Sequence, residues 1–183
     1  MHLRSQFADI DFHIILSPAG DPKLEVKDAL FTAHVIICAT PSRTPLFPSS
    51  WIRSGTHLIL IGSYTKDMHE IDDTLLLRAT PKLLVDSRSA CLVEAGEVIS
   101  AGLRPEDMSE LGELVIAPGT WTSLDHDASD DLDSGPVTIF KSVGVGLQDV
   151  AIACAVVNKA QEMLMNGKKL GVLVDDYDLF NLS

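Results

Sequence analysis

Short apolar runs of four to six residues alternate with segments of helical periodicity along most of this 183-residue chain. The runs lie at residues 11–16, 34–39, 57–61, 82–85 and 137–140. Apolar runs with few polar interruptions are typical of strands whose two sheet faces are both covered. Strands that alternate with helices favour a parallel sheet, because parallel neighbours need long crossover connections. The sequence therefore predicts an α/β fold with a mostly parallel, doubly wound sheet.

Helical patterns fill the intervals between these runs. Asp21 can cap a helix whose first position is Pro22. Three further helices are expected, over residues 67–79, 88–100 and 145–165. We also expect a short helix at 103–114, and residues 169–175 fit one more strand.

An acidic stretch interrupts the alternation at about 118–136 and is expected to be a solvated loop inserted in the domain. Five carboxylates between Asp125 and Asp133 contribute to a formal net charge of −12. Nucleic acids and anionic membranes are themselves negative, so this charge argues against both as partners. The length predicts a single domain over residues 1–183.

The three cysteines, Cys38, Cys91 and Cys154, lie among apolar neighbours and share no metal-like spacing. We expect buried free thiols in a reduced compartment and no metal site. No apolar stretch approaches the roughly 20 residues that a membrane span requires, and the N-terminus shows no signal-peptide pattern. These features predict a soluble, cytoplasmic protein.

Small and polar residues follow two of the predicted strands. Thr40 could bond a ribose or a phosphate through its hydroxyl; the alternative is a simple turn anchored by Pro41. Gly62 could let a ligand approach the backbone closely, or it could serve only a tight turn from strand to helix.

Polar residues also follow the fourth and fifth predicted strands. Ser87 is expected to cap the next helix, with Asp86 at the positive end of that helix. After the last strand, Ser142 could cap the long helix, Lys141 could hold an anion and Gly144 opens space. In parallel α/β sheets ligands bind at the carboxyl ends of strands, so these loops are where a site is expected.

No strand in the sequence leads into a Gly-x-Gly-x-x-Gly turn. Gly144 and Gly146 lack the third glycine of that pattern. The ten residues before Asp11 are too few for the βα unit that carries such a turn. We therefore expect the sheet to be truncated at its N-terminal side, without the helix N-terminus that usually grips phosphate.

Five blocks of sequence stand in a fixed order along the chain. They are ICATPSRTPLF at 37–47, GTHLILIGSYTKDMHEI at 55–71, VDSRSACLVEAG at 85–96, ELGEL at 110–114 and TIFKSVGVGLQD at 138–149. In content, order and spacing they resemble the C-terminal half of the ornithine cyclodeaminase/mu-crystallin family. The similarity covers roughly Asp11 to Met163.

This resemblance implies a Rossmann-like fold, here a partial NAD(P)-binding domain, in a subunit that forms a homodimer through a separate substrate-binding domain. The family's chemistry is hydride exchange between NAD or NADP and a small amino or imino acid. By position, the resemblance places residues beside the cofactor and substrate. The expected cofactor-binding residues are Thr40, Ile61, Gly62, Ser63 and Ser142, and Val143 is the expected substrate-binding residue.

The chain also departs from the family pattern. Tyr64 occupies the position where cyclodeaminases carry a proton-handling aspartate, and Met68 replaces a lysine. A phenol is a poor base at neutral pH, so the catalytic residue stays unknown. Three hypotheses remain. One is an enzyme of this family whose other residues come from a further segment or chain, and the second is a truncated, non-catalytic binding or vestigial protein. The third is a small-ligand-binding interaction module, which would require a partner to cover its exposed apolar surface.

Overall fold

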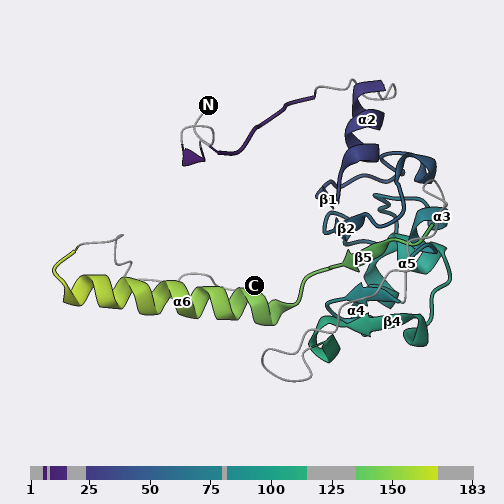
Figure 1. The fold of residues 1–183 in the computed structure, drawn as a ribbon. Helices are drawn as coiled ribbons and strands as arrows, with labels where there is room; N and C mark the ends of the chain where they lie inside the picture. Colours follow the sequence, from purple (N-terminus) through teal and green to yellow (C-terminus); the bar gives the residue numbers. More distant parts are fainter. Residues whose placement is uncertain (1–5, 8, 16–23, 80–81, 115–134, 169–183) are drawn as a thin grey trace. The chain divides into compact units, whose positions relative to one another are not determined.

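A computed structural model describes residues 6–7, 9–15, 24–79, 82–114 and 135–168 of the chain. The chain forms two compact units, Met1–Gly144 and Val145–Ser183. The first unit holds the whole described sheet, and the second contains a long helix (Figure 1).

The sheet of the first unit has five strands, all parallel. In chain order the strands are β1 (Val35–Cys38), β2 (His57–Leu60), β3 (Leu83–Val85), β4 (Met108–Glu110) and β5 (Thr138–Lys141). Their order across the sheet is β1-β2-β5-β3-β4, so the last strand enters between β2 and β3. The parallel α/β fold expected from the sequence is confirmed, and four of the five apolar runs form strands.

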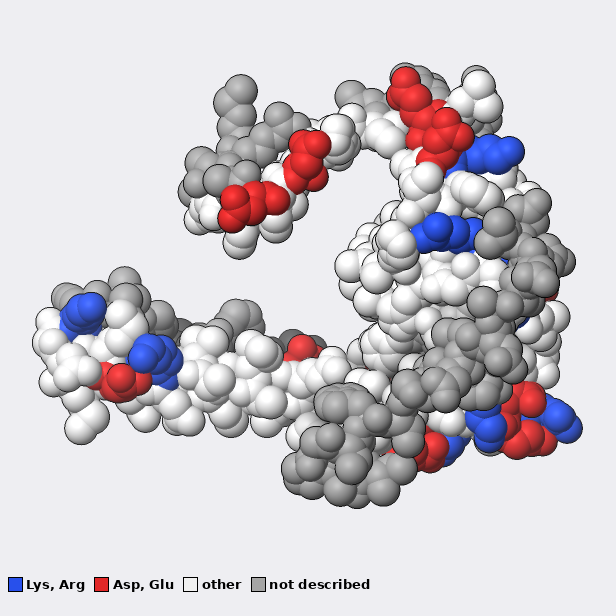
Figure 2. Space-filling view, viewed as in Figure 1, with Lys and Arg blue, Asp and Glu red and all other residues white. Residues whose placement is uncertain are grey.

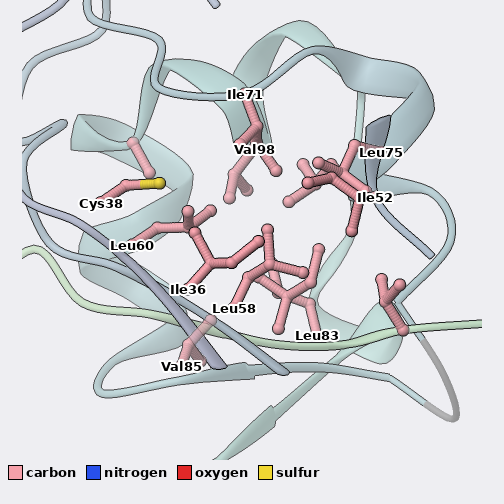
Figure 3. Packing of buried hydrophobic residues seen from close by; sticks show 14 of the residues in the cluster. Ile36, Cys38, Ile52, Leu58, Leu60, Ile71, Leu75, Leu83, Val85 and Val98 are labelled. Carbon is pink, nitrogen blue, oxygen red and sulfur yellow. The ribbon is translucent and has the colours of Figure 1, made fainter. Parts of the chain in front are cut away.

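The hydrophobic core lies on one face of this sheet, where the inward side chains of the strands meet three short helices. Leu58, Leu60 and Val85 are inaccessible to solvent, as are Leu75 and Val98 from the helices (Figure 3). The helices are α3 (Asp73–Leu76), α4 (Arg88–Glu94) and α5 (Gly96–Ser100). Fully burying such an aliphatic side chain stabilises the fold by about 1.5–3 kcal/mol.

The opposite face of the sheet is less covered by the described residues. Alternate residues of β1, Val35 and Ile37, are 55% and 63% exposed. Ile37 pairs with Ile59 and Ile59 with Phe140, which places these side chains in one row across the sheet. Ahead of β1, α2 (Leu24–Thr32) contributes Leu30, which packs partly against the core.

The expected helix at 67–79 is much shorter in the structure. Only Asp73–Leu76 is helical, with Asp72 as its N-cap accepting from the backbone N–H of Leu75 at 2.8 Å. The residues before it form a loop because the side chain of Glu70 turns into the protein and is fully buried.

The expected helix at 88–100 is divided into α4 and α5. The backbone is extended at Ala95, with φ −82° and ψ 107°. The next residue, Gly96, lies so close to the carbonyl oxygen of Met68 that any Cβ would collide with it. Ser87 caps α4 as expected, its hydroxyl accepting from the backbone N–H of Ala90 at 3.4 Å.

Two further expectations were wrong. Residues 11–15 do not form a strand. Instead of a helix, the 103–114 segment contains β4 between two 3₁₀ turns, Pro105–Asp107 and Leu111–Leu114. A third 3₁₀ turn, Ser49–Trp51, precedes β2. The helix cap at Asp21, the strand at 169–175 and most of the acidic loop lie outside the described residues.

The second unit contains α6 (Gly146–Met165), a helix without a buried residue. Its charged residues are Asp149, Lys159 and Glu162, and its middle turns are apolar (Figure 2).

Ser142 does not cap this helix; its N-cap is Val145, which makes no side-chain capping bond. Cys154 is exposed on α6, contrary to the expected burial. No helix in the described ranges is long and apolar enough to cross a membrane.

The three thiols should differ sharply in reactivity. Burial raises the pKa of both Cys38 and Cys91 to about 12, so almost no nucleophilic thiolate is present near neutral pH. We expect a thiol reagent to label Cys154 rapidly in the native protein and the other two only on unfolding. Mass spectrometry of the labelled peptides measures this. Rapid native labelling of Cys38 or Cys91 would contradict the core described above.

Candidate functional site

The strand ends of the first unit meet at one edge of the sheet. Backbone bonds continue across this edge just beyond the strands: Ile61 N donates to Cys38 O at 3.0 Å, Ser142 N to Leu60 O at 2.9 Å and Asp86 N to Lys141 O at 3.3 Å. The structure therefore brings the loops of Thr40, Gly62, Asp86 and Ser142 together, as the sequence predicts for parallel strands.

Glu70 joins the loops that follow β1 and β2. Its Oε1 accepts from the backbone N–H of Thr40 at 2.6 Å and from the Thr40 hydroxyl at 3.0 Å. Its Oε2 accepts from the backbone N–H of Gly62 at 2.8 Å. The residue is completely buried, and these charge-assisted bonds replace the water that its carboxylate has lost.

Gly62 is required at its position by the close approach of two loops. A Cβ there would collide with the backbone N and O of Thr40 and with Oε1 of Glu70. The glycine thus serves internal packing between the loops, in addition to any role in letting a ligand reach the backbone.

Asp86 plays a similar part for the loop that follows β5. Its Oδ2 accepts from the Ser142 hydroxyl at 2.7 Å and from the backbone N–H groups of Val143 and Gly144 at 3.1 and 2.8 Å. Its Oδ1 accepts from the backbone N–H of Ser87 at 2.8 Å. Asp86 therefore fixes the turn at which Gly144 adopts a φ of +88°, a conformation that favours glycine.

Lys141 does not hold an external anion, contrary to the expectation from the sequence. It is fully buried, and its ammonium donates to the backbone oxygen of Ser63 at 2.5 Å. Oε2 of Glu97, also fully buried, lies 3.9 Å from the ammonium nitrogen. Burial lowers the pKa of Lys141, and the nearby carboxylates of Glu97 and Glu70 oppose that shift.

Glu97 connects this lysine to the strand-end loops. Its Oε1 accepts from the backbone N–H of Glu70 at 2.8 Å, and its Oε2 lies 2.8 Å from the Ser63 hydroxyl. Ser63 is fully buried, and its hydroxyl also lies 2.8 Å from the carbonyl oxygen of Met68. A hydroxyl has one proton to donate, and both of these acceptors belong to the protein.

Other side chains of the edge are open to solvent. Ile61 is 46% exposed and Tyr64 is 53% exposed, while Val143 is half-buried. Ile61 therefore offers an apolar surface at the edge, next to the backbone of Gly62.

The edge has few hydrogen-bond donors left for a ligand. The backbone N–H groups of Thr40, Gly62, Val143 and Gly144 all donate to internal carboxylates. The hydroxyl protons of Thr40 and Ser142 point to the same two carboxylates. These four amides therefore form no anion-binding cradle of the kind that grips phosphate.

Glu70 and Glu97 were not predicted from the sequence as residues of the site. Glu97 carried a usable signal, because it stands in the apolar stretch Ala95–Ile99, where a carboxylate needs internal partners. Glu70 has an apolar neighbour only on one side, Ile71, so its neighbours in the sequence did not indicate that it is buried.

The parallel order of strands, with loops converging at their carboxyl ends, defines a Rossmann-like α/β protein. The model of the ornithine cyclodeaminase/mu-crystallin family matches residues 16–163. The chain belongs to this family.

Individual relatives share about a third of their matched residues with this chain. A Delta(1)-pyrroline-2-carboxylate reductase from Colwellia psychrerythraea is 34% identical over 152 residues, which cover 79% of this chain and 45% of that protein. The ketimine reductase mu-crystallin of Mus musculus is 31% identical over 136 residues, covering 73% of this chain and 39% of that protein. The chain thus spans less than half the length of these relatives.

Solved structures agree with this assignment. The Delta(1)-pyrroline-2-carboxylate reductase of Thermococcus litoralis, in complex with NADH and L-proline, superposes with a TM-score of 0.63 at 28% identity, covering 80% of this chain and 42% of that one. The iminosuccinate reductase of Paracoccus denitrificans, in complex with NAD⁺, gives 0.55 at 32% identity, covering 70% and 37%.

Replacing Gly62 by alanine should destabilise the first unit, because the added Cβ collides with the backbone of Thr40. We expect a loss of about 1–3 kcal/mol or more in the free energy of unfolding. Gly112→Ala is the matched control, since a Cβ at Gly112 meets nothing within 4 Å, and it should change stability by less than about 0.5 kcal/mol. Chemical denaturation measures both. Equal stabilities of the two variants would contradict the close packing of the loops.

Proposed function

We propose that this chain forms one wall of an NAD(P)-binding site in a reductase of small imino acids. The observation that carries the proposal is the convergence of the loops after β1, β2 and β5 at one edge of the sheet. The two solved relatives described with NADH or NAD⁺ share this fold. Ligands of parallel α/β sheets bind at this edge.

The residues of the edge suit part of a dinucleotide better than the whole. Exposed apolar Ile61, next to Gly62, fits the flat face of a nucleoside or nicotinamide ring. The backbone N–H groups of Thr40, Gly62 and Gly144 already donate to internal carboxylates, so these three amides would not bind a pyrophosphate. The phosphates would therefore be held outside these loops.

Individual roles follow from this arrangement. Thr40, Ile61, Gly62 and Ser142 would line the cofactor side, the two hydroxyls acting as acceptors because their protons already bond to Glu70 and Asp86. Ser63 would support the loop from below, since its side chain is buried.

Val143, half-buried beside Ser142, would face the substrate. Exposed Tyr64 would present its hydroxyl to the substrate as a hydrogen-bond donor. When bound, the cofactor would supply a hydride to an imine carbon, or accept one from the carbon that carries an amine.

A second candidate is nucleotide binding without turnover. It is favoured by the same engaged amides, since an edge without phosphate contacts would bind a dinucleotide weakly. The two functions share a cofactor site and differ only in whether substrate is reduced.

Cofactor titration with a charge substitution tests the proposal. NADH should bind the wild-type protein, and Ile61→Asp should weaken binding at least tenfold, because a carboxylate would replace the apolar surface at the edge. Leu77→Asp is the matched control: Leu77 is also exposed but follows α3, away from the strand-end loops. NADH fluorescence gives the dissociation constants.

Failure of the wild-type protein to bind either NADH or NADPH would refute the proposed site for this chain. Oxidation of the bound cofactor on addition of Δ1-pyrroline-2-carboxylate would select reduction over binding alone. Binding without oxidation would select the second candidate.

A further inference from the structure

We propose that Glu70 is a positioning residue of the cofactor edge: its carboxylate sets the spacing between the Thr40 and Gly62 loops. This inference rests on the proposed function, because it concerns the same edge. The side chain itself is fully buried and would not touch a ligand.

The Glu70 carboxylate links the two loops just beyond the last paired residues of β1 and β2. The β1–β2 pairing ends with Cys38 opposite Leu60. Thr40 and Gly62 each lie two residues further on, and their backbone N–H groups donate to the two oxygens of one side chain, at 2.6 and 2.8 Å. Glu70 thus extends the register of the two strands beyond the sheet.

Only a carboxylate satisfies the donors at this point. Three protons converge on it: two from Thr40, through its backbone N–H and its hydroxyl, and one from the backbone N–H of Gly62. An amide of the same size has one acceptor oxygen, and its NH₂ group can only donate. In Glu70→Gln the NH₂ group would therefore face a backbone N–H of one of the two loops, and two donors cannot bond to each other.

The backbone of Glu70 is itself held in place. Its N–H donates to Oε1 of Glu97 at 2.8 Å, and its carbonyl accepts from the backbone N–H of Leu46 at 2.9 Å. Glu97 is in turn fixed by its contact with Lys141. The side chain therefore meets the two loops from a rigid base, which is what a positioning residue requires.

Asp72 provides a matched control two residues away. It is another carboxylate that joins two segments, accepting from the backbone N–H of Ser49 at 3.0 Å and of Leu75 at 2.8 Å. Neither partner belongs to the strand-end loops. Asp72→Asn repeats the carboxylate-to-amide change, so a merely structural effect should be similar in the two variants.

The experiment compares NADH binding by wild-type protein, Glu70→Gln and Asp72→Asn, each at a temperature where the protein is folded. We expect Glu70→Gln to weaken binding at least tenfold and Asp72→Asn less than twofold. Glu70→Asp should behave like Glu70→Gln, because the shorter side chain keeps its charge but cannot reach both loops. Equal affinity of Glu70→Gln and wild type would overturn the inference while leaving the proposed site intact.

A second measurement needs no variant. Because one side chain holds both amides, Thr40 and Gly62 should be released together, and their hydrogen-exchange protection factors should agree within about threefold. Protection factors that differ more than tenfold would overturn the inference even if a variant fails to fold. Absence of NADH binding by wild-type protein would instead refute the proposed function. The protection factors of Thr40 and Gly62 would then test the spacing role of Glu70 by themselves.

Discussion

The arrangement of the strand-end loops depends on two internal carboxylates that accept backbone hydrogen bonds. Glu70 joins the loops after β1 and β2, and Asp86 joins β3 to the loop after β5. A carboxylate withdrawn from water is stable only when its oxygens are bonded. Glu70 is fully buried and Asp86 is half-buried, and both meet that condition with backbone and hydroxyl donors. The backbone bonds of the sheet reach only the first residue after β2, β3 and β5, so the two side chains hold the loops beyond that point.

The bonding of the loop amides to these carboxylates also limits which ligands the edge can bind. An amide that donates to Glu70 or Asp86 is not available to a phosphate, so the edge presents an apolar side chain at Ile61 and acceptor oxygens at Thr40 and Ser142. In the proposed site this surface would contact the uncharged part of a dinucleotide. The proposed role is therefore one wall of a cofactor site rather than the whole site.

The sequence predicted the features that depend on local patterns. The parallel sheet followed from apolar runs, the cap at Ser87 from residue type, and the shared edge from strand ends. It failed where tertiary contacts override helical periodicity. The helix expected at 67–79 gives way to a loop because Glu70 turns inward, and the helix at 88–100 breaks because Gly96 packs on Met68. The burial of Lys141 was equally hidden, since its partner Glu97 is distant in sequence.

The central claim is that the edge amides are committed to internal carboxylates. Amide resonances of Thr40, Gly62, Val143 and Gly144, followed by NMR during titration with inorganic pyrophosphate, test it most directly. We predict slow hydrogen exchange at all four amides and no change in their chemical shifts as pyrophosphate is added. Rapid exchange in the free protein, or shifts that saturate with pyrophosphate, would contradict the account, because the amides would then be free to bind an anion.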